Sequence, residues 1–133
     1  MLTDQDFSRA MDVERAMYRS LSELEELTQE LAQAADRGDK VSVQMSLAMR
    51  RDPLEQVARH QAALRRQYTA LPAPDARLLR TLLEDASPPA VSGAEALVRQ
   101  AARNRTLLAR IVAADRRINQ KVAGRSSFYA KRP

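Results

Sequence analysis

His60 is the only histidine in the chain, so it is the first side chain to consider as a general acid or base. A catalytic imidazole needs a partner group that orients it and a pocket that holds the substrate, and its neighbour Gln61 supplies neither. Cysteine is absent, the carboxylates are scattered along predicted solvent-facing helix sides, and the three glycines are isolated. These spacings fit neither a metal centre nor a phosphate-binding loop. We therefore predict a protein without enzymatic activity, metal, cofactor or small-molecule substrate.

Charged side chains are the second group that could do chemistry, and that chemistry would be binding. Residues 1–39 carry ten acids against four arginines, whereas residues 99–133 carry ten Lys or Arg against one acid, Asp115. Clustered cations can neutralise phosphates, so a basic helical nucleic-acid-binding protein stays open as the alternative interpretation. These cations are, however, distributed around the predicted helix, with one aromatic pair nearby to stack on bases. We expect the acidic and basic helices to attract each other and Asp115 to form an ion pair.

The predicted last helix, residues 92–123, combines an apolar stripe with two polar interruptions. Ser92 and Glu95 have the spacing of an N-terminal capping box, and apolar residues follow at intervals of three and four. Asn104 and Asp115 fall within the stripe, where burial without a partner would be costly. Two interpretations stay open. The stripe is bundle core, or it is a partner-binding face that the protein's own helices cover only in part.

The whole pattern predicts an all-α fold: an antiparallel helical bundle or long helical hairpin with coiled-coil-like packing. Ala, Leu, Arg, Gln and Glu dominate the composition, which favours helices. In the first helix, residues 4–37, apolar positions repeat every seven residues over four repeats. Two more helices are expected at residues 39–71 and 75–86, and proline-containing segments separate the later elements.

Single residues set the predicted boundaries of these helices. Gly38 is expected to end the first helix and Asp39 to begin the second. Pro53 either kinks the second helix or divides it, and the compatible stripes on both sides favour a kink. A glycine at position 124 is expected to end the last helix. We predict one helical domain over residues 1–133, of which residues 124–133 form a flexible tail.

Location is predicted from three absences in the sequence. Cysteine is lacking, the N-terminal residues are acidic without an apolar core, and no run of about eighteen apolar residues occurs. We expect a cytoplasmic protein without a signal peptide or a membrane-spanning helix.

The order of these features resembles a known family. An acidic amphipathic first helix is followed by a Gly-Asp turn, a long second helix, a broken middle, and a last helix that leads to small residues and an aromatic pair. The residues that carry the likeness are Gly38-Asp39, Arg103-Asn104, Leu107-Leu108, Gly124-Arg125-Ser126-Ser127 and Phe128-Tyr129. The layout is similar to that of the FlgN-type flagellar export chaperones. These small helical cytoplasmic proteins hold hook-associated proteins before type III export.

This resemblance implies a non-catalytic chaperone or adaptor whose partner is a protein client. The family holds its client through the C-terminal amphipathic region, and an apolar stripe can cover an amphipathic client helix. The partner-binding residues implied here are Leu108, Ile111, Val112, Ile118, Val122, Phe128 and Tyr129. A homo-oligomer is a further possibility.

A second apolar cluster lies near the start of the second helix. Val41, Met45 and Met49 are spaced as neighbours on one helix face. Methionines at such spacing are usually core, and less often an adaptable binding surface. We predict core packing here and keep the cluster as a second candidate surface.

Overall fold

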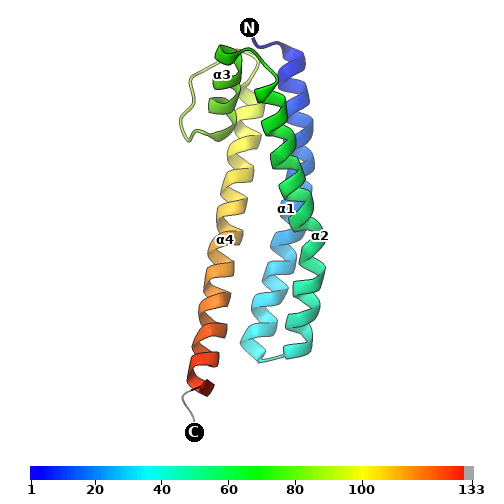
Figure 1. Ribbon diagram of the computed structural model, residues 1–133, viewed down its shortest axis with the longest axis vertical. Helices are drawn as coiled ribbons and strands as arrows, with labels where there is room; N and C mark the ends of the chain where they lie inside the picture. Colours follow the sequence, from blue (N-terminus) through cyan, green and yellow to red (C-terminus); the bar gives the residue numbers. More distant parts are fainter. Residues whose placement is uncertain (131–133) are drawn as a thin grey trace.

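Four helices make up the described part of the chain. The computed structural model describes the backbone of residues 1–130 and the side chains of residues 1–123. Within that part the helices are α1 (Asp4–Arg37), α2 (Lys40–Thr69), α3 (Ala73–Glu84) and α4 (Glu95–Ala130), and no strand occurs (Figure 1). The predicted all-α fold is confirmed.

α1 and α2 form an antiparallel hairpin. The Thr3 side chain accepts the Asp6 N–H, and the Asp6 carboxylate accepts the Thr3 N–H, so a capping box begins α1. Gly38 ends α1 with φ 69°, a left-handed conformation that glycine adopts at little cost. Asp39 then accepts the Ser42 N–H at 3.1 Å and caps α2. The predicted turn at these two residues is confirmed.

α4 lies beside α1 and runs parallel to it. Arg110 of α4 pairs with Glu25 of α1, and Lys121 pairs with Asp36. Both pairs join residues 85 positions apart, and a constant offset requires parallel helices. The expected attraction between the acidic first helix and the basic last helix is therefore found. It acts between parallel helices because the chain returns to the start of α1 before α4 begins (Figure 1).

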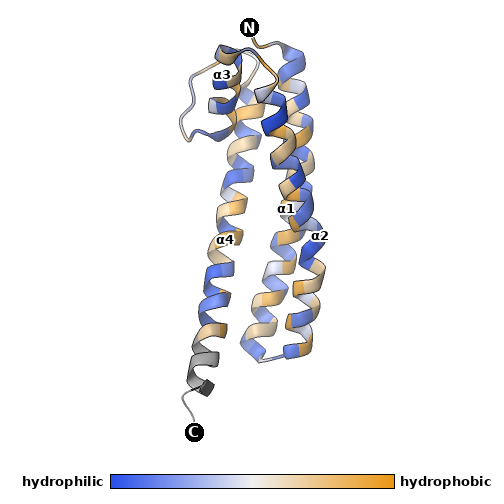
Figure 2. Ribbon diagram, in the orientation of Figure 1, coloured by the Kyte–Doolittle hydropathy of each residue, from blue (hydrophilic) through white to orange (hydrophobic). Residues whose placement is uncertain are grey.

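The first helix supplies most of the core because it packs against two partners. α1 packs against both α2 and α4, whereas the backbones of α2 and α4 do not approach each other closely in the described part. Buried residues of α1 follow the predicted seven-residue repeat, and apolar and polar positions alternate along every helix (Figure 2). The buried members of α1 are Phe7, Ala10, Glu14, Met17, Ser20, Leu21, Leu24, Leu27, Thr28, Leu31, Ala34 and Ala35.

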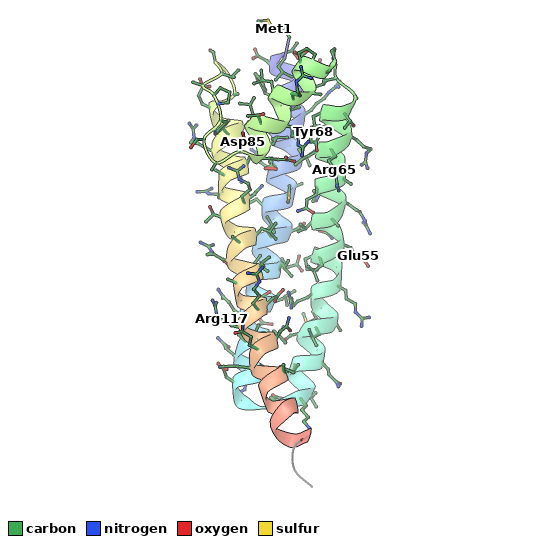
Figure 3. All side chains as sticks on the ribbon, turned by 60° about the vertical axis from the view of Figure 1, so that its left-hand side comes forward. Met1, Glu55, Arg65, Tyr68, Asp85 and Arg117 are labelled. Carbon is green, nitrogen blue, oxygen red and sulfur yellow. The ribbon has the colours of Figure 1, made fainter. Side chains whose placement is uncertain are left out.

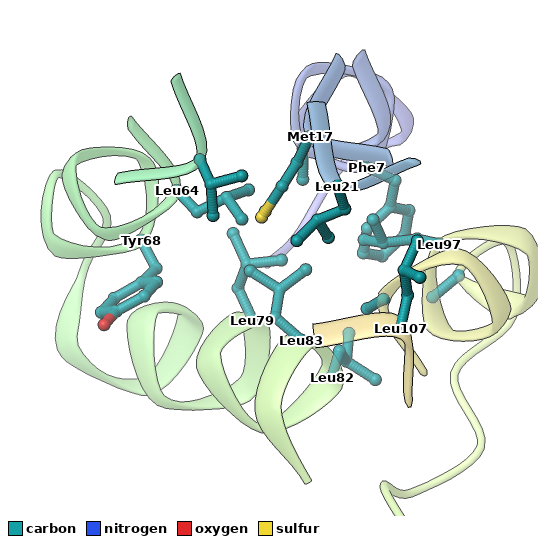
Figure 4. Close-up of a cluster of buried hydrophobic side chains, with 14 of the residues drawn as sticks. Phe7, Met17, Leu21, Leu64, Tyr68, Leu79, Leu82, Leu83, Leu97 and Leu107 are labelled. Atoms are coloured by element: carbon teal, nitrogen blue, oxygen red, sulfur yellow. The ribbon is translucent and has the colours of Figure 1, made fainter. Parts of the chain in front are cut away.

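α3 fills the space between α2 and α4 at one end of the molecule. Leu79, Leu82 and Leu83 are buried and point into a cluster formed with α1, α2 and α4 (Figure 4). The twelve residues of α3 extend about 18 Å, whereas the 36 residues of α4 extend about 54 Å. α3 therefore completes a four-helix arrangement over only part of the bundle's length.

Several predicted boundaries are corrected by the structure. α2 continues through Pro53 without a break, as the preferred interpretation required. α4 begins at Glu95, and Ser92 lies in the preceding turn, so the predicted capping box is wrong. Glu95 instead accepts the N–H of Gly93 at 3.0 Å. α4 also continues past Gly124, since the residues after it keep helical hydrogen bonding up to Ala130.

Candidate partner-binding groove

A cavity marks the place where α3 ends. It has a volume of about 260 Å³ and is partly open. Met17 and Leu21 of α1 form its floor, and its sides come from α2, α3 and α4. Figure 3 looks onto this side of the molecule, with Asp85 at the end of α3 and Arg65 and Tyr68 on α2. Beyond this cavity no helix of the described chain lies between α2 and α4, and we call the resulting space the α2–α4 groove.

α2 contributes one apolar wall of this groove. Gln61 lines the cavity, and Leu54 and Leu47 lie seven and fourteen residues before it, on the same helix face. Leu54 is 46% exposed and Leu47 is 48% exposed. Two large apolar side chains of α2 therefore remain uncovered next to the core.

α4 contributes the opposite wall. Leu108 lines the cavity and is half-buried, and Val112 follows it by one turn. Val112 is 40% exposed and Val122, fourteen residues after Leu108, is 44% exposed. Both walls of the α2–α4 groove therefore carry apolar side chains that the chain's own helices leave incompletely covered.

One ion pair crosses the groove at mid-length. Arg50 of α2 donates through Nη2 to Oδ2 of Asp115 of α4 at 2.7 Å. The Arg50 side chain is 7% exposed and that of Asp115 is 34% exposed. The predicted ion-pair role of Asp115 is confirmed. Arg50 Nε and Asp115 Oδ1 are buried without a hydrogen-bond partner in the described part, so the pair is incompletely satisfied.

A second polar contact lies beside the cavity. Asn104 donates to the Glu14 backbone carbonyl at 2.8 Å and to the Glu14 carboxylate at 3.2 Å. Burial raises the pKa of Glu14, while the Asn104 hydrogen bond and the nearby Arg105 act in the opposite direction. The polar residue in the predicted apolar stripe thus has partners, and it fixes the relative position of α1 and α4.

Much of the positive charge of α4 is already used within the fold. Arg105 donates to the carbonyl oxygens of Leu83 and Asp85 at the end of α3, and Arg103 lies over the Tyr18 ring at 5.6 Å. Arg110 and Lys121 pair with acids of α1. This internal use agrees with the expectation from the charge pattern.

The predicted partner-binding residues divide into three groups. Leu108 lines the cavity, and exposed Val112 and Val122 follow it at helical spacing along the same side of α4. Ile111 and Ile118 are 3% and 7% exposed and pack against α1, so they serve the core. The remaining two, Phe128 and Tyr129, lie outside the residues whose side chains are described, as does the predicted tail at residues 124–133.

The second candidate surface lies on the other side of α2. Met45 and Met49 face Glu30 and Gln33 of α1, away from α4. Val41, Met45 and Met49 are 70%, 59% and 56% exposed, so the prediction that they are core is wrong. The end of the α1–α2 hairpin has no further helix to cover them.

His60 lies in a shallow hollow between α1 and α2. It lies between Arg19 and Arg59, and burial together with these two cations lowers its pKa. No group of three His, Cys, Asp or Glu residues is placed to hold a metal ion within the described part. No described helix is both long and apolar enough to span a membrane.

Two features of the site were missed in the sequence. Glu14 lies in the heptad line of Phe7, Leu21 and Thr28, and this spacing could have identified it as a buried carboxylate. Leu47 and Leu54 could not be assigned to a groove, because their exposure depends on the short length of α3.

Comparison with known proteins adds no relative. No family model, no curated protein and no solved structure matches this chain.

Proposed function

We propose that this protein is a non-catalytic chaperone or adaptor that holds an amphipathic helix of a client protein in the α2–α4 groove. One observation carries the proposal: α3 is too short to cover the space between α2 and α4, and exposed Leu54 and Val112 remain on its walls. An amphipathic helix placed there, over the Arg50–Asp115 pair, would complete the four-helix arrangement and bury both apolar walls.

The client class comes from the resemblance of the sequence to the FlgN-type flagellar export chaperones. On that basis the client is a hook-associated protein, held in the cytoplasm before type III export through an amphipathic terminal helix. Such a helix is unpaired before assembly, and covering it would prevent premature association. To cover a client helix, the protein needs a complementary shape and an apolar surface, but no nucleotide, metal or catalytic group.

The direct test uses purified protein and synthetic terminal helices of hook-associated proteins from the same cell. Isothermal titration calorimetry should detect binding to the wild-type chain and no measurable binding to the Leu54→Asp, Val112→Asp double variant. Both positions are exposed, so circular dichroism should show unchanged helicity.

A matched control tests whether binding depends on the groove itself or on any exposed apolar side chains. The Val41→Asp, Met49→Asp variant also places two carboxylates at exposed apolar positions of the hairpin, but outside the groove. It should bind the client like the wild type. The proposed site is contradicted if both variants lose client binding equally. It is also contradicted if the Leu54→Asp, Val112→Asp variant still binds the client. Salt-sensitive binding to unrelated oligonucleotides without client binding would instead favour the nucleic-acid alternative.

A further inference from the structure

The cavity at the end of α3 is suited to a single large apolar side chain. Leu64, Leu83 and Leu108 line it together with the floor residues Met17 and Leu21. Its volume of about 260 Å³ exceeds the roughly 150 Å³ of an apolar cavity that can hold a benzene ring. A phenylalanine or leucine side chain entering from the groove would therefore fit and would exclude water from these leucines.

Uncompensated positive charge lies along both walls of the groove. Arg65 lines the cavity, and Arg51 lies two heptads before it on α2. On α4, Arg116 lies one turn after Val112. All three are exposed, and no described carboxylate lies within ion-pair distance of them.

Of the acids near the groove, Glu14 lines the cavity and accepts from Asn104, and the other two are paired with cations. Glu84, at the edge of the cavity, pairs with Arg80 at 2.9 Å. Asp115 pairs with Arg50. Apart from the Arg50–Asp115 pair and Glu14, the groove offers apolar side chains between cationic edges. Charge complementarity selects an occupant that is apolar on one face and acidic on its flanks.

We propose that the occupant of the α2–α4 groove is a client helix with acidic flanks, whose carboxylates meet Arg51, Arg65 and Arg116. One bulky apolar side chain of this helix fills the cavity beside Leu83. This inference rests on the proposed function and names the chemistry of its ligand. The apolar anchor supplies affinity, whereas the flanking charges select the partner and its orientation.

The test uses synthetic amphipathic helical peptides of about 16 residues, or roughly 24 Å of helix. This matches the stretch of α4 from Leu108 to Ala123, over which side chains are described. All peptides share one leucine stripe with a phenylalanine near one end, and they differ only in glutamate or lysine flanks. The wild-type protein should bind the glutamate peptide at least about tenfold more tightly at low salt, and added salt should reduce the difference. Fluorescence anisotropy measures both affinities.

Charge reversal locates the selecting residues. Arg51→Glu with Arg65→Glu should reverse the preference towards the lysine peptide. Arg15→Glu with Arg66→Glu changes the net charge equally at exposed positions that do not line the cavity, and it should keep the original preference. A reversal in both variants would show that net charge, and not the groove edge, makes the selection, which overturns the inference.

The anchor is tested by changing the phenylalanine of the peptide to alanine. This change should weaken binding to the wild-type protein about tenfold or more. In a Leu108→Trp variant, which fills the cavity from within, the two peptides should bind alike. A phenylalanine preference that survives this substitution, in a variant with wild-type helicity, places the anchor elsewhere and refutes the cavity assignment.

Failure of the inference differs from failure of the proposed function. If a hook-associated helix binds in the groove but flank charge and anchor have no effect, the function stands and the ligand chemistry is wrong. If neither that helix nor any peptide binds, both proposals fail. Sedimentation that shows a dimer of the protein, dissociated by Leu54→Asp with Val112→Asp, would make a second copy the occupant and overturn the inference.

Discussion

The two ends of the bundle are built from the same three long helices but differ in how well these are covered. At the α3 end, Leu79 and Leu82 close the space between α2 and α4 and are at most 1% exposed. Towards the α1–α2 turn a smaller cluster contains Leu31, Ala35 and Ile118, with Val43 packed against it. The long helices alone thus leave apolar walls uncovered, and one short helix decides where they are covered.

Under the proposed function, this difference separates a region that stabilises the fold from a region that binds the client. Leu64 and Leu54 both belong to α2, yet Leu64 is buried beside α3 while Leu54 is 46% exposed beyond it. A partner helix gains most where the protein's own helices bury least, because the apolar area removed from water drives association.

The largest expected effect contrasts two leucines. Leu82→Ala removes a fully buried side chain and should lower the free energy of unfolding by about 2–5 kcal/mol. Leu54→Ala, in the groove, should change it by no more than about 0.5 kcal/mol in the absence of a client. Urea denaturation followed by circular dichroism measures both. Similar losses would show that the groove wall is as well packed as the α3 end.

An intermediate effect is expected at the ion pair that crosses the groove. Asp115→Ala leaves the Arg50 guanidinium buried without its partner and should cost about 1–3 kcal/mol. Arg50→Met should cost less, because the remaining carboxylate of Asp115 is one-third exposed. The Arg50→Met, Asp115→Ala double variant should recover most of the loss in the same denaturation assay. If the loss in free energy of unfolding in the double variant equals the sum of the two single losses, the ion pair contributes no coupling energy.

The smallest effect concerns Glu14, beside the cavity. Burial raises its pKa, so the folded protein binds a proton more readily than the unfolded chain. Stability from this group is therefore present at low pH and is lost as pH rises through the folded pKa. Glu14→Gln can still accept from Asn104 and should be more stable at neutral pH by about 1 kcal/mol. The advantage should shrink on acidification, and thermal unfolding across pH measures it. A constant difference would mean that Glu14 does not titrate in this way.

The sequence by itself determined the helices and the inner face of the first one. Heptad spacing predicted the bounds of α1, and Gly38 and Asp39 predicted the turn, because caps and periodicity are local properties of the chain. The opposite charges of the first and last helices also predicted their attraction. The start of α4 was less certain, since Glu95 can accept from Gly93 as readily as complete a capping box with Ser92.

Only the tertiary structure decided which apolar residues are core and which are surface. Ile111 and Val112 are neighbours in the same predicted stripe, yet Ile111 faces α1 and Val112 faces the groove. The amphipathic pattern of α4 is compatible with packing against one helix or against two, and the sequence does not distinguish these cases. The number of helices that pack against α4 is set by the short length of α3 and by the chain's return to the start of α1 before α4 begins. They leave the backbones of α2 and α4 apart beyond the end of α3, where the Arg50–Asp115 pair joins them, and this physical arrangement creates the groove.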